Sequence, residues 1–189
     1  MLNHSTTRYG KVAQAFHWAT ALLVLVTFLY GPGGSEQRVY SVARDFDRQI
    51  HETLGLCVFV LVFLRALWRM VDRRPDPLEL PRWMDMAAKT VQAVLYLLLL
   101  AIPITAIAGA WLEGHPLTLL SGVRIAPPLA TSHDVGATIA TIHTWLGDAI
   151  LWLAGFHALA ALYHHLILKD GVLASMLPLW VPLSRPDRR

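Results

Sequence analysis

Four histidines in apolar stretches are the residues of this chain best suited to chemistry. His143 and His157 stand fourteen residues apart in one such stretch. On an α-helix fourteen residues turn through about 1400°, within about 40° of a whole number of turns, so the two imidazoles share one face. At about 1.5 Å per residue they lie about 21 Å apart along the axis. Because one metal ion cannot bridge that distance, the stretch predicts two separate sites at two depths.

Two further histidines complete these sites as pairs. His17 lies near the beginning of the first apolar stretch, and His51 opens the second. If the stretches are helices that cross a membrane in alternating directions, His17 and His157 fall at one depth, and His51 and His143 at the other. An imidazole inside a membrane is costly and usually functional, so two matched pairs are a strong functional signal.

Two neutral imidazoles that face each other across a helix bundle can bind a haem iron as trans axial ligands. A zinc site would need three or four protein ligands at one point, and no cysteine, carboxylate or further histidine joins either pair. Each histidine is followed four positions later by a small residue that would leave room for a flat macrocycle: Ala21, Gly55, Gly147 and Ala161. The pattern therefore favours two non-covalent b-type haems.

Each of these residues also has a simpler interpretation. A single histidine in an apolar helix is often only a hydrogen-bonding residue between helices, and glycine or alanine often marks close helix packing. A small transporter that uses its histidines for protons or metal ions is an alternative from another functional class, and it predicts a colourless protein. The four histidines taken together favour haem ligation.

Polar residues near the two ends of the expected bundle are further candidates. His164 lies seven residues after His157 on nearly the same face, and it could donate a hydrogen bond to a quinone carbonyl. An equal alternative is that His164 and His165 are interfacial polar residues. At the opposite end three arginines could steer an anionic electron donor, although ordinary loop charges are an alternative there: Arg44, Arg48 and Arg124.

The elements that must position these residues are membrane-spanning helices. The 189 residues are 55% hydrophobic and only 15% charged, and several uncharged runs approach the roughly 20 residues that span a bilayer. We expect one all-α domain over residues 1–189, an integral membrane four-helix bundle in contact with lipid and without a nucleic-acid partner. The single cysteine, Cys57, excludes an internal disulfide and is expected to be buried. The helices are predicted at 12–30, 51–70, 83–112 and 135–169.

The lysines and arginines predict the orientation of this bundle. Only four of the sixteen lie in the first and third loops (Arg38, Arg44, Arg48 and Arg124). The others lie in or beside the N-terminal segment, the second loop and the C-terminal tail. By the positive-inside rule both termini are cytoplasmic, which makes the pair of His17 and His157 the inner pair. The pair of His51 and His143 is the outer one.

Three short segments carry a resemblance to a known family: FHW at 16–18, IHETLG at 50–55 and FHALAALYHHLILKD at 156–170. Together with the four-helix plan they resemble the bacterial cytochrome b561 family. They are especially similar to its short stand-alone members, among which are superoxide:ubiquinone oxidoreductases. The resemblance covers nearly the whole chain, and the last of the three segments is its most specific part.

The resemblance implies a multi-pass protein of the bacterial inner membrane with two b haems, whose iron atoms take the four histidines as axial ligands. His17 and His157 would hold the inner haem, and His51 and His143 the outer one. Superoxide would be oxidised at the outer, periplasmic side, and ubiquinone would accept the electrons near His164. The alternative is a cytochrome subunit that relays electrons between quinone and a dehydrogenase or a periplasmic redox protein.

Overall fold

Four long helices form the protein in a computed structural model that describes residues 8–72, 75, 80–128, 130–178 and 181. Each is long and apolar enough to cross a membrane, which confirms the all-α four-helix membrane bundle. After the last of them the chain continues as a π-helical segment, η2 (His164–Leu168). The four helices are α1 (Lys11–Leu29), α3 (Asp45–Val71), α4 (Arg82–Leu112) and α5 (His133–Tyr163).

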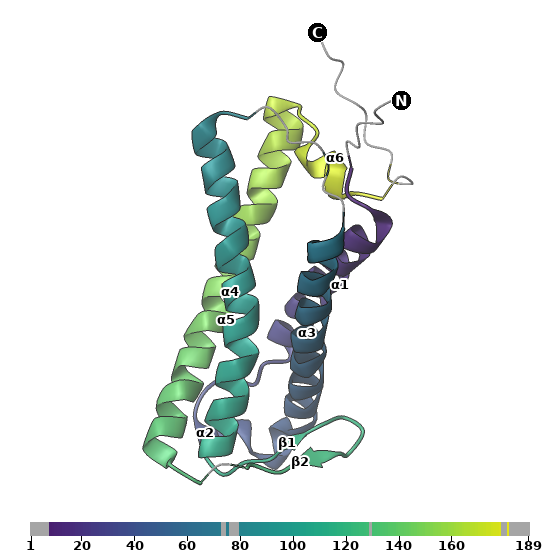
Figure 1. Cartoon of the computed structure of the whole chain (residues 1–189). Coiled ribbons are helices and arrows are strands. Elements are labelled where there is room, and N and C mark those ends of the chain that lie inside the picture. The colour runs from purple at the N-terminus through teal and green to yellow at the C-terminus, as the bar shows by residue number, and fades with distance from the viewer. Residues whose placement is uncertain (1–7, 73–74, 76–79, 129, 179–180, 182–189) are drawn as a thin grey trace.

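The helices form two pairs, with α4 beside α5 and α1 beside α3 (Figure 1). The end of the bundle closed by α6 (Val172–Met176) is called the inner end. There Tyr9 donates its backbone N–H to the carbonyl of Ser175 at 3.1 Å, and Trp18 donates Nε1–H to the carbonyl of Met176 at 2.9 Å. The first and last described parts of the chain therefore meet at one end, as an even number of spans requires.

Short elements close the opposite, outer end (Figure 1). They are α2 (Glu36–Val39), η1 (Val42–Arg44) and an antiparallel hairpin of β1 (Leu117–Thr118) and β2 (Arg124–Ile125). This end lies against α3, because Thr118 donates its backbone N–H to the carboxylate of Glu52 and Leu120 donates to the hydroxyl of Thr53 at 2.8 Å. The hairpin thus covers the part of α3 that carries His51.

The helix α3 begins at Asp45, six residues before the predicted start at 51. Charged residues assigned to a loop form its first two turns. Asp45 and Asp47 stand in the first turn, where negative charge favours the helix N-terminus. Arg48 pairs with Asp45 three residues before it and with Glu52 four residues after it, spacings that stabilise a helix.

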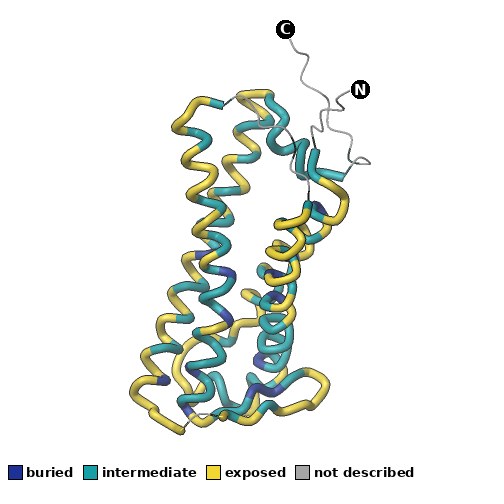
Figure 2. The backbone as a smooth tube through the Cα atoms, in the orientation of Figure 1, coloured by how far each residue is buried: buried dark blue, intermediate teal, exposed yellow. Residues whose placement is uncertain are grey.

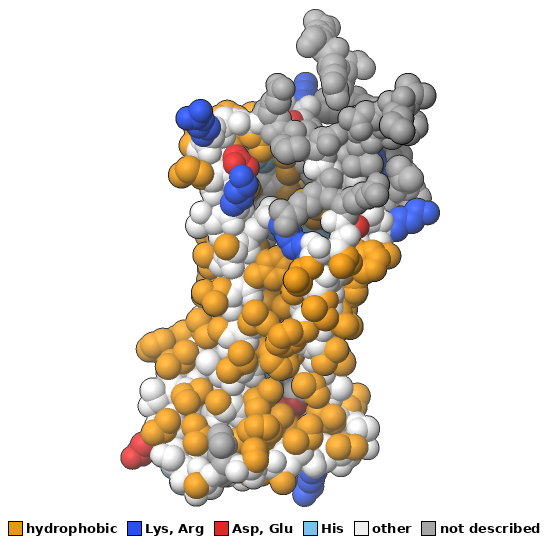
Figure 3. All heavy atoms as spheres, viewed as in Figure 1, with side chains coloured by type: hydrophobic (Ala, Val, Ile, Leu, Met, Phe, Trp, Pro, Cys, Tyr) orange, Lys and Arg blue, Asp and Glu red, His pale blue; other side chains and the backbone are white. Residues whose placement is uncertain are grey.

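The protein core is small, and most apolar side chains face outward. Val58, Val62, Leu99 and Ile150 form the buried cluster between the helix pairs. Figure 2 shows that exposed residues follow the outward faces of the long helices. Figure 3 shows hydrophobic side chains over the middle of the bundle and most of the visible Lys and Arg near the inner end. This is the surface of a protein solvated by lipid.

Cys57 lies on this outward face of α3 and is exposed, so its predicted burial within the protein is wrong. Apolar side chains of a membrane helix can face either lipid or the protein interior. Hydrophobicity along a membrane helix therefore does not show which side chains face the core.

Candidate functional site

The outer histidines face each other across the bundle, His51 from α3 and His143 from α5. Their ring centroids are 6.0 Å apart and the ring planes meet at 87°. Nδ1 of His51 lies 2.8 Å from the carbonyl oxygen of Thr27, and Nδ1 of His143 lies 2.9 Å from that of Ile102. Since a carbonyl only accepts, both imidazoles carry their proton on Nδ1. Nε2 of each ring is therefore free to bind a metal, the arrangement typical of ligating histidines.

The end of α1 supplies one of these acceptors. The carbonyls of a last helical turn have no N–H donor within the helix, and here the N–H of Gly31 bonds to Phe28 and leaves Thr27 available. A Cβ added at Gly31 would lie 3.1 Å from the Phe28 carbonyl and 3.4 Å from the ring of His51. The glycine that follows the C-terminus of α1 therefore also makes room for the imidazole.

An apolar cavity adjoins this pair of histidines. The four long helices and β1 form its walls, and the space between them measures about 780 Å³, including the part open to the outside. Gly55 and Gly147 lie in its lining. A Cβ added at Gly147 would meet no atom within 4 Å, and one at Gly55 would meet only Thr27 Cγ2, at 3.9 Å. Gly55 and Gly147 therefore do lie beside open space, as expected of residues that leave room for a macrocycle.

The geometry of both histidine pairs fits one iron held between two imidazoles. With metal–nitrogen bonds of about 2.0 Å and about 1.15 Å from each nitrogen to its ring centre, two trans ligands place their ring centroids about 6.3 Å apart. The outer pair is 6.0 Å apart, and the inner pair, His17 and His157, is 6.4 Å apart with ring planes at 75°. The structure thus brings together the pairs that were predicted from spacing.

The inner pair has a different environment. Arg65 on α3 lies with Nη2 3.2 Å from Nδ1 of His17. A guanidinium only donates, so Nδ1 of His17 is the acceptor and its ring proton sits on Nε2 in this geometry. Binding a metal through Nε2 requires that proton to move to Nδ1 and Arg65 to turn aside. His157 makes no hydrogen bond to the described residues, so its ring is free to adjust.

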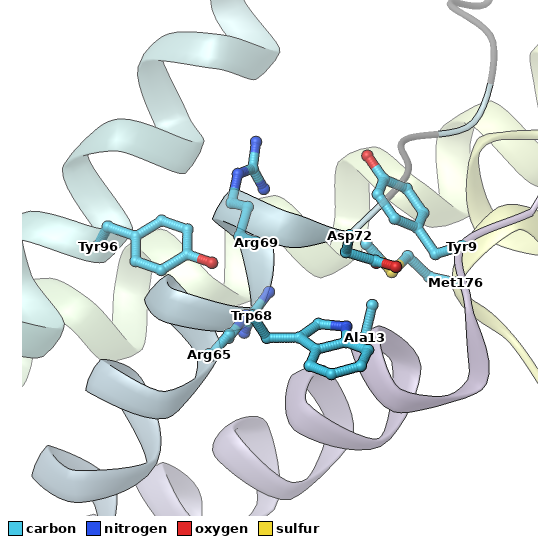
Figure 4. A pocket seen from close by; sticks show the side chains of 8 residues that line it. All are labelled: Tyr9, Ala13, Arg65, Trp68, Arg69, Asp72, Tyr96 and Met176. Atoms are coloured by element: carbon cyan, nitrogen blue, oxygen red, sulfur yellow. The ribbon is translucent and has the colours of Figure 1, made fainter.

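A pocket near the inner pair holds two arginines, Arg65 and Arg69, that form no ion pair within the described part of the chain. Figure 4 shows both on α3 with the ring of Tyr96 facing them across the pocket. Their guanidinium carbons lie 5.3 Å and 5.8 Å from the Tyr96 ring centroid. Two such cations are suited to bind carboxylates like the propionates of a haem.

His164 is the first residue of η2, at the inner end. Its Nδ1 lies 2.5 Å from Asp170 Oδ2, and the other carboxylate oxygen of Asp170 accepts the N–H of Val172 at 3.0 Å. Lys169, with φ of 52°, turns the chain so that Asp170 comes back to His164. The candidate quinone residue is therefore held by an acidic partner, an arrangement suited to moving a proton.

The three outer arginines differ in how far their charge is balanced. Arg48 is buried between Asp45 and Glu52, and Arg44 lies 3.0 Å from Asp47. Arg124, on β2, is exposed and makes no ion pair to any residue that the structure describes. Of the three, Arg124 has the charge most available to an anion.

Comparisons with known proteins agree with this arrangement. The family described as prokaryotic cytochrome b561 matches residues 8–179. The chain belongs to the prokaryotic cytochrome b561 family. It is 30% identical to cytochrome b561 homolog 2 of Escherichia coli K12, over 90% of this chain and 91% of that protein. It is 31% identical to cytochrome b561 homolog 1 of the same organism, over 90% and 97%.

A third relative has a name that includes an activity. The chain is 29% identical to a protein of Yersinia pestis named probable superoxide oxidase CybB, over 90% of this chain and 96% of that protein. Cytochrome b561 proteins are bacterial membrane proteins that bind haem b and transfer electrons. This membership favours haem b as the cofactor of this chain over the transporter alternative.

Several groups of this cytochrome b561 site could not be read from the sequence. The carbonyls of Thr27 and Ile102 are backbone atoms, so no residue type marks them. In the sequence Arg65 is only a charged residue near the end of a helix, and nothing there indicates that it contacts His17. Asp170, the partner of His164, lies six residues further along the chain. Only the turn at Lys169 brings its carboxylate close to His164.

Proposed function

We propose that this cytochrome b561 is a di-haem oxidoreductase of the bacterial inner membrane that passes electrons from superoxide, at its outer end, to ubiquinone at its inner end. His51 and His143 hold the outer iron, and His17 and His157 the inner one. The observation that carries the proposal is the separation of the rings in each pair, 6.0 Å and 6.4 Å. Bound in such pairs, haem supplies reversible one-electron transfer.

At the outer site the protein keeps its ligands neutral and oriented. The carbonyls of Thr27 and Ile102 accept the Nδ1 protons, so Nε2 of His51 and His143, two residues of the cavity lining, can bind without a change of tautomer. Apolar walls exclude water from that side. Oxidation of superoxide to O₂ releases one electron and no proton, so no acid or base is needed there. Arg124 supplies the positive charge that attracts the anion.

At the inner site the protein supplies charge and a proton. Arg65 and Arg69 stabilise negative charge near His17, which favours an electron at the inner end over one at the outer end. Reduction of a quinone to a quinol takes two electrons and two protons. Nε2 of His164 is the group that hydrogen-bonds to the quinone oxygen, and Asp170 orients the ring and stabilises its protonated form.

The relatives give this function graded support. One similar protein is named a probable superoxide oxidase, at 29% identity. The E. coli relatives bear names that specify no substrate. Superoxide as the donor therefore needs a direct test on this chain.

The test uses the purified haem-loaded protein in detergent. We expect two b haems per chain from the pyridine haemochrome spectrum. Under anaerobic conditions, pulses of superoxide should reduce them, and a soluble ubiquinone should then reoxidise them. Superoxide dismutase added beforehand is the control and should abolish reduction. Haems that stay oxidised after superoxide would refute the proposed donor.

A second candidate is a relay subunit that takes electrons from a redox protein or a quinol. The observation that favours it is the neutralisation of Arg44 and Arg48 by acidic side chains, which leaves little free positive charge for an anion. In that case the haems are inert to superoxide but are reduced by quinol or by a membrane fraction that contains a dehydrogenase.

A further inference from the structure

A second set of metal-ligand side chains lies at the outer end, apart from both histidine pairs. Glu36 begins α2, Glu113 follows the last residue of α4, and His115 lies in the loop that leads to β1. One ligand atom from each of the three lies within 4.8 Å of the others. Nε2 of His115 is 2.6 Å from Oε1 of Glu36. Two segments that are distant in the sequence, the start of α2 and the chain just after α4, thus converge here.

Glu113 is the unusual member of this cluster. It is only 8% exposed, yet within the described part of the chain its carboxylate takes part in no hydrogen bond or ion pair. The residue is mostly enclosed by protein, and a carboxylate in such a setting that lacks a partner favours a nearby cation. The helix α5 holds Glu113 in place, because a Cβ added at Gly136 would lie 2.7 Å from its Cγ.

His115 is also held in one orientation. Its ring stacks on that of Tyr40, with centroids 3.5 Å apart and planes at 20°. Tyr40 is in turn covered by the guanidinium of Arg48, 5.1 Å from the ring centroid. The stacking fixes the plane of the imidazole, so its Nε2 stays directed toward the carboxylates. A ligand set held on two of its three members is preorganised for an ion.

We propose that Glu36, Glu113 and His115 form a binding site for a divalent transition-metal ion of the zinc class. Two carboxylates and a neutral imidazole balance the charge of such an ion. The imidazole favours zinc-like ions over Mg²⁺ and Ca²⁺, which prefer oxygen ligands. Three protein ligands leave the fourth tetrahedral position for water.

The distances are compatible with this coordination. In a tetrahedral site with bonds of about 2.0–2.1 Å, the donor atoms lie roughly 3.3–3.4 Å apart. The exposed Glu36 can move outward from 2.6 Å, and the donors at up to 4.8 Å can close by rotation of side chains. A bound ion joins α2 to the end of α4 and so fixes the loops that cover the outer end.

The test measures Zn²⁺ binding to the haem-loaded protein after treatment with EDTA and buffer exchange. Isothermal titration with Zn²⁺ should show one ion per chain. X-ray absorption at the zinc edge, which haem iron does not disturb, should show one nitrogen neighbour typical of imidazole and the rest oxygen. Glu113→Gln and His115→Gln should each weaken binding at least tenfold. Glu36→Gln, at an exposed position, is the variant least able to disturb folding and should also weaken it.

The matched control is Asp47→Asn, which removes a carboxylate of the same end that lies outside the cluster and pairs with Arg44. It should leave the affinity unchanged, and all variants should keep the haem spectrum of the parent. Absence of a one-to-one binding event would overturn the proposal. So would Zn²⁺ binding that none of the three cluster variants weakens, because the ion would then sit elsewhere. The haem content is measured separately, so failure of the di-haem function would not be mistaken for failure of this site.

Discussion

The outer and inner histidine pairs have nearly the same ring separation but opposite surroundings. In the outer pair two backbone carbonyls accept the Nδ1 protons of His51 and His143. In the inner pair a guanidinium, that of Arg65, donates to Nδ1 of His17. The outer imidazoles are thus already in the neutral tautomer that binds a metal. The inner pair has a positive charge beside it, and His17 must change its tautomer before it binds. The same ligand pattern can therefore be built to favour tight binding at one depth and electron retention at the other.

The largest expected effect comes from removing an outer ligand. His143→Ala should reduce the haem content from two to one per chain, because a haem held by two axial ligands loses one of them while the inner pair stays intact. The pyridine haemochrome assay and the absorption spectrum measure this. His133→Ala, on the same helix, is the control and should keep both haems. Loss of both haems from a folded protein would contradict two independent sites.

The next effect tests the open space beside the outer pair. Gly147→Leu places a side chain in the cavity, and we expect it to remove at least half of the outer haem while both ligands remain. Gly155→Leu is the matched control, since Gly155 lies on the same helix in an exposed position with no atom within 4 Å of an added Cβ. Equal haem loss in the two variants would show that leucine disturbs α5 itself.

A smaller effect should separate the two sites by their charge. Arg65→Gln removes a positive charge that lies beside His17 and that turns aside when the iron binds. At an effective dielectric constant of about 20, a unit charge roughly 7–10 Å away is worth about 2 kcal/mol, or about 70–100 mV. We expect the midpoint potential of the inner haem to fall by up to that amount and that of the outer haem to change little. A spectroelectrochemical titration measures both.

The control for this titration is Lys89→Gln. Lys89 is an exposed cation on α4 already paired with Asp85 at 2.6 Å, so its removal should leave both potentials unchanged. A shift of both haems in the Arg65 variant by the same amount would mean that the two sites do not differ in the way the structure indicates.

The pairing of the histidines could be predicted from the sequence because a membrane-spanning helix restricts the depth at which each residue lies. A helix must cross the bilayer in about 20 residues, so the position of His17 or His51 along its helix fixes its depth. The four-helix plan and the pairing at two depths follow from that. The start of α3 was predicted too late, because the charges of Asp45, Asp47 and Arg48 are typical of a loop until their helical ion pairs are seen.

What surrounds each pair was not accessible in this way. The partners of His51 and His143 are carbonyls, and every residue has one. The pairing of His164 with Asp170 depends on a left-handed turn at Lys169 that a lysine does not signal. The cluster of Glu36, Glu113 and His115 is a similar case. Glu36 lies 77 and 79 residues before the other two, and only the folded loops bring the three together.

The smallest expected effect concerns the positive charge at the outer end. Arg124→Gln should slow haem reduction by superoxide about twofold at low salt, because an exposed charge about 10 Å from the path of an anion contributes only about 0.4 kcal/mol in water. The difference should vanish as salt is raised. Stopped-flow rates at two ionic strengths measure it, with Arg44→Gln as the control, since Asp47 already balances that charge. If the two variants slow reduction equally, an unbalanced arginine is not what distinguishes the outer end, and the contrast with Arg65 at the inner end would rest on the haem potentials alone.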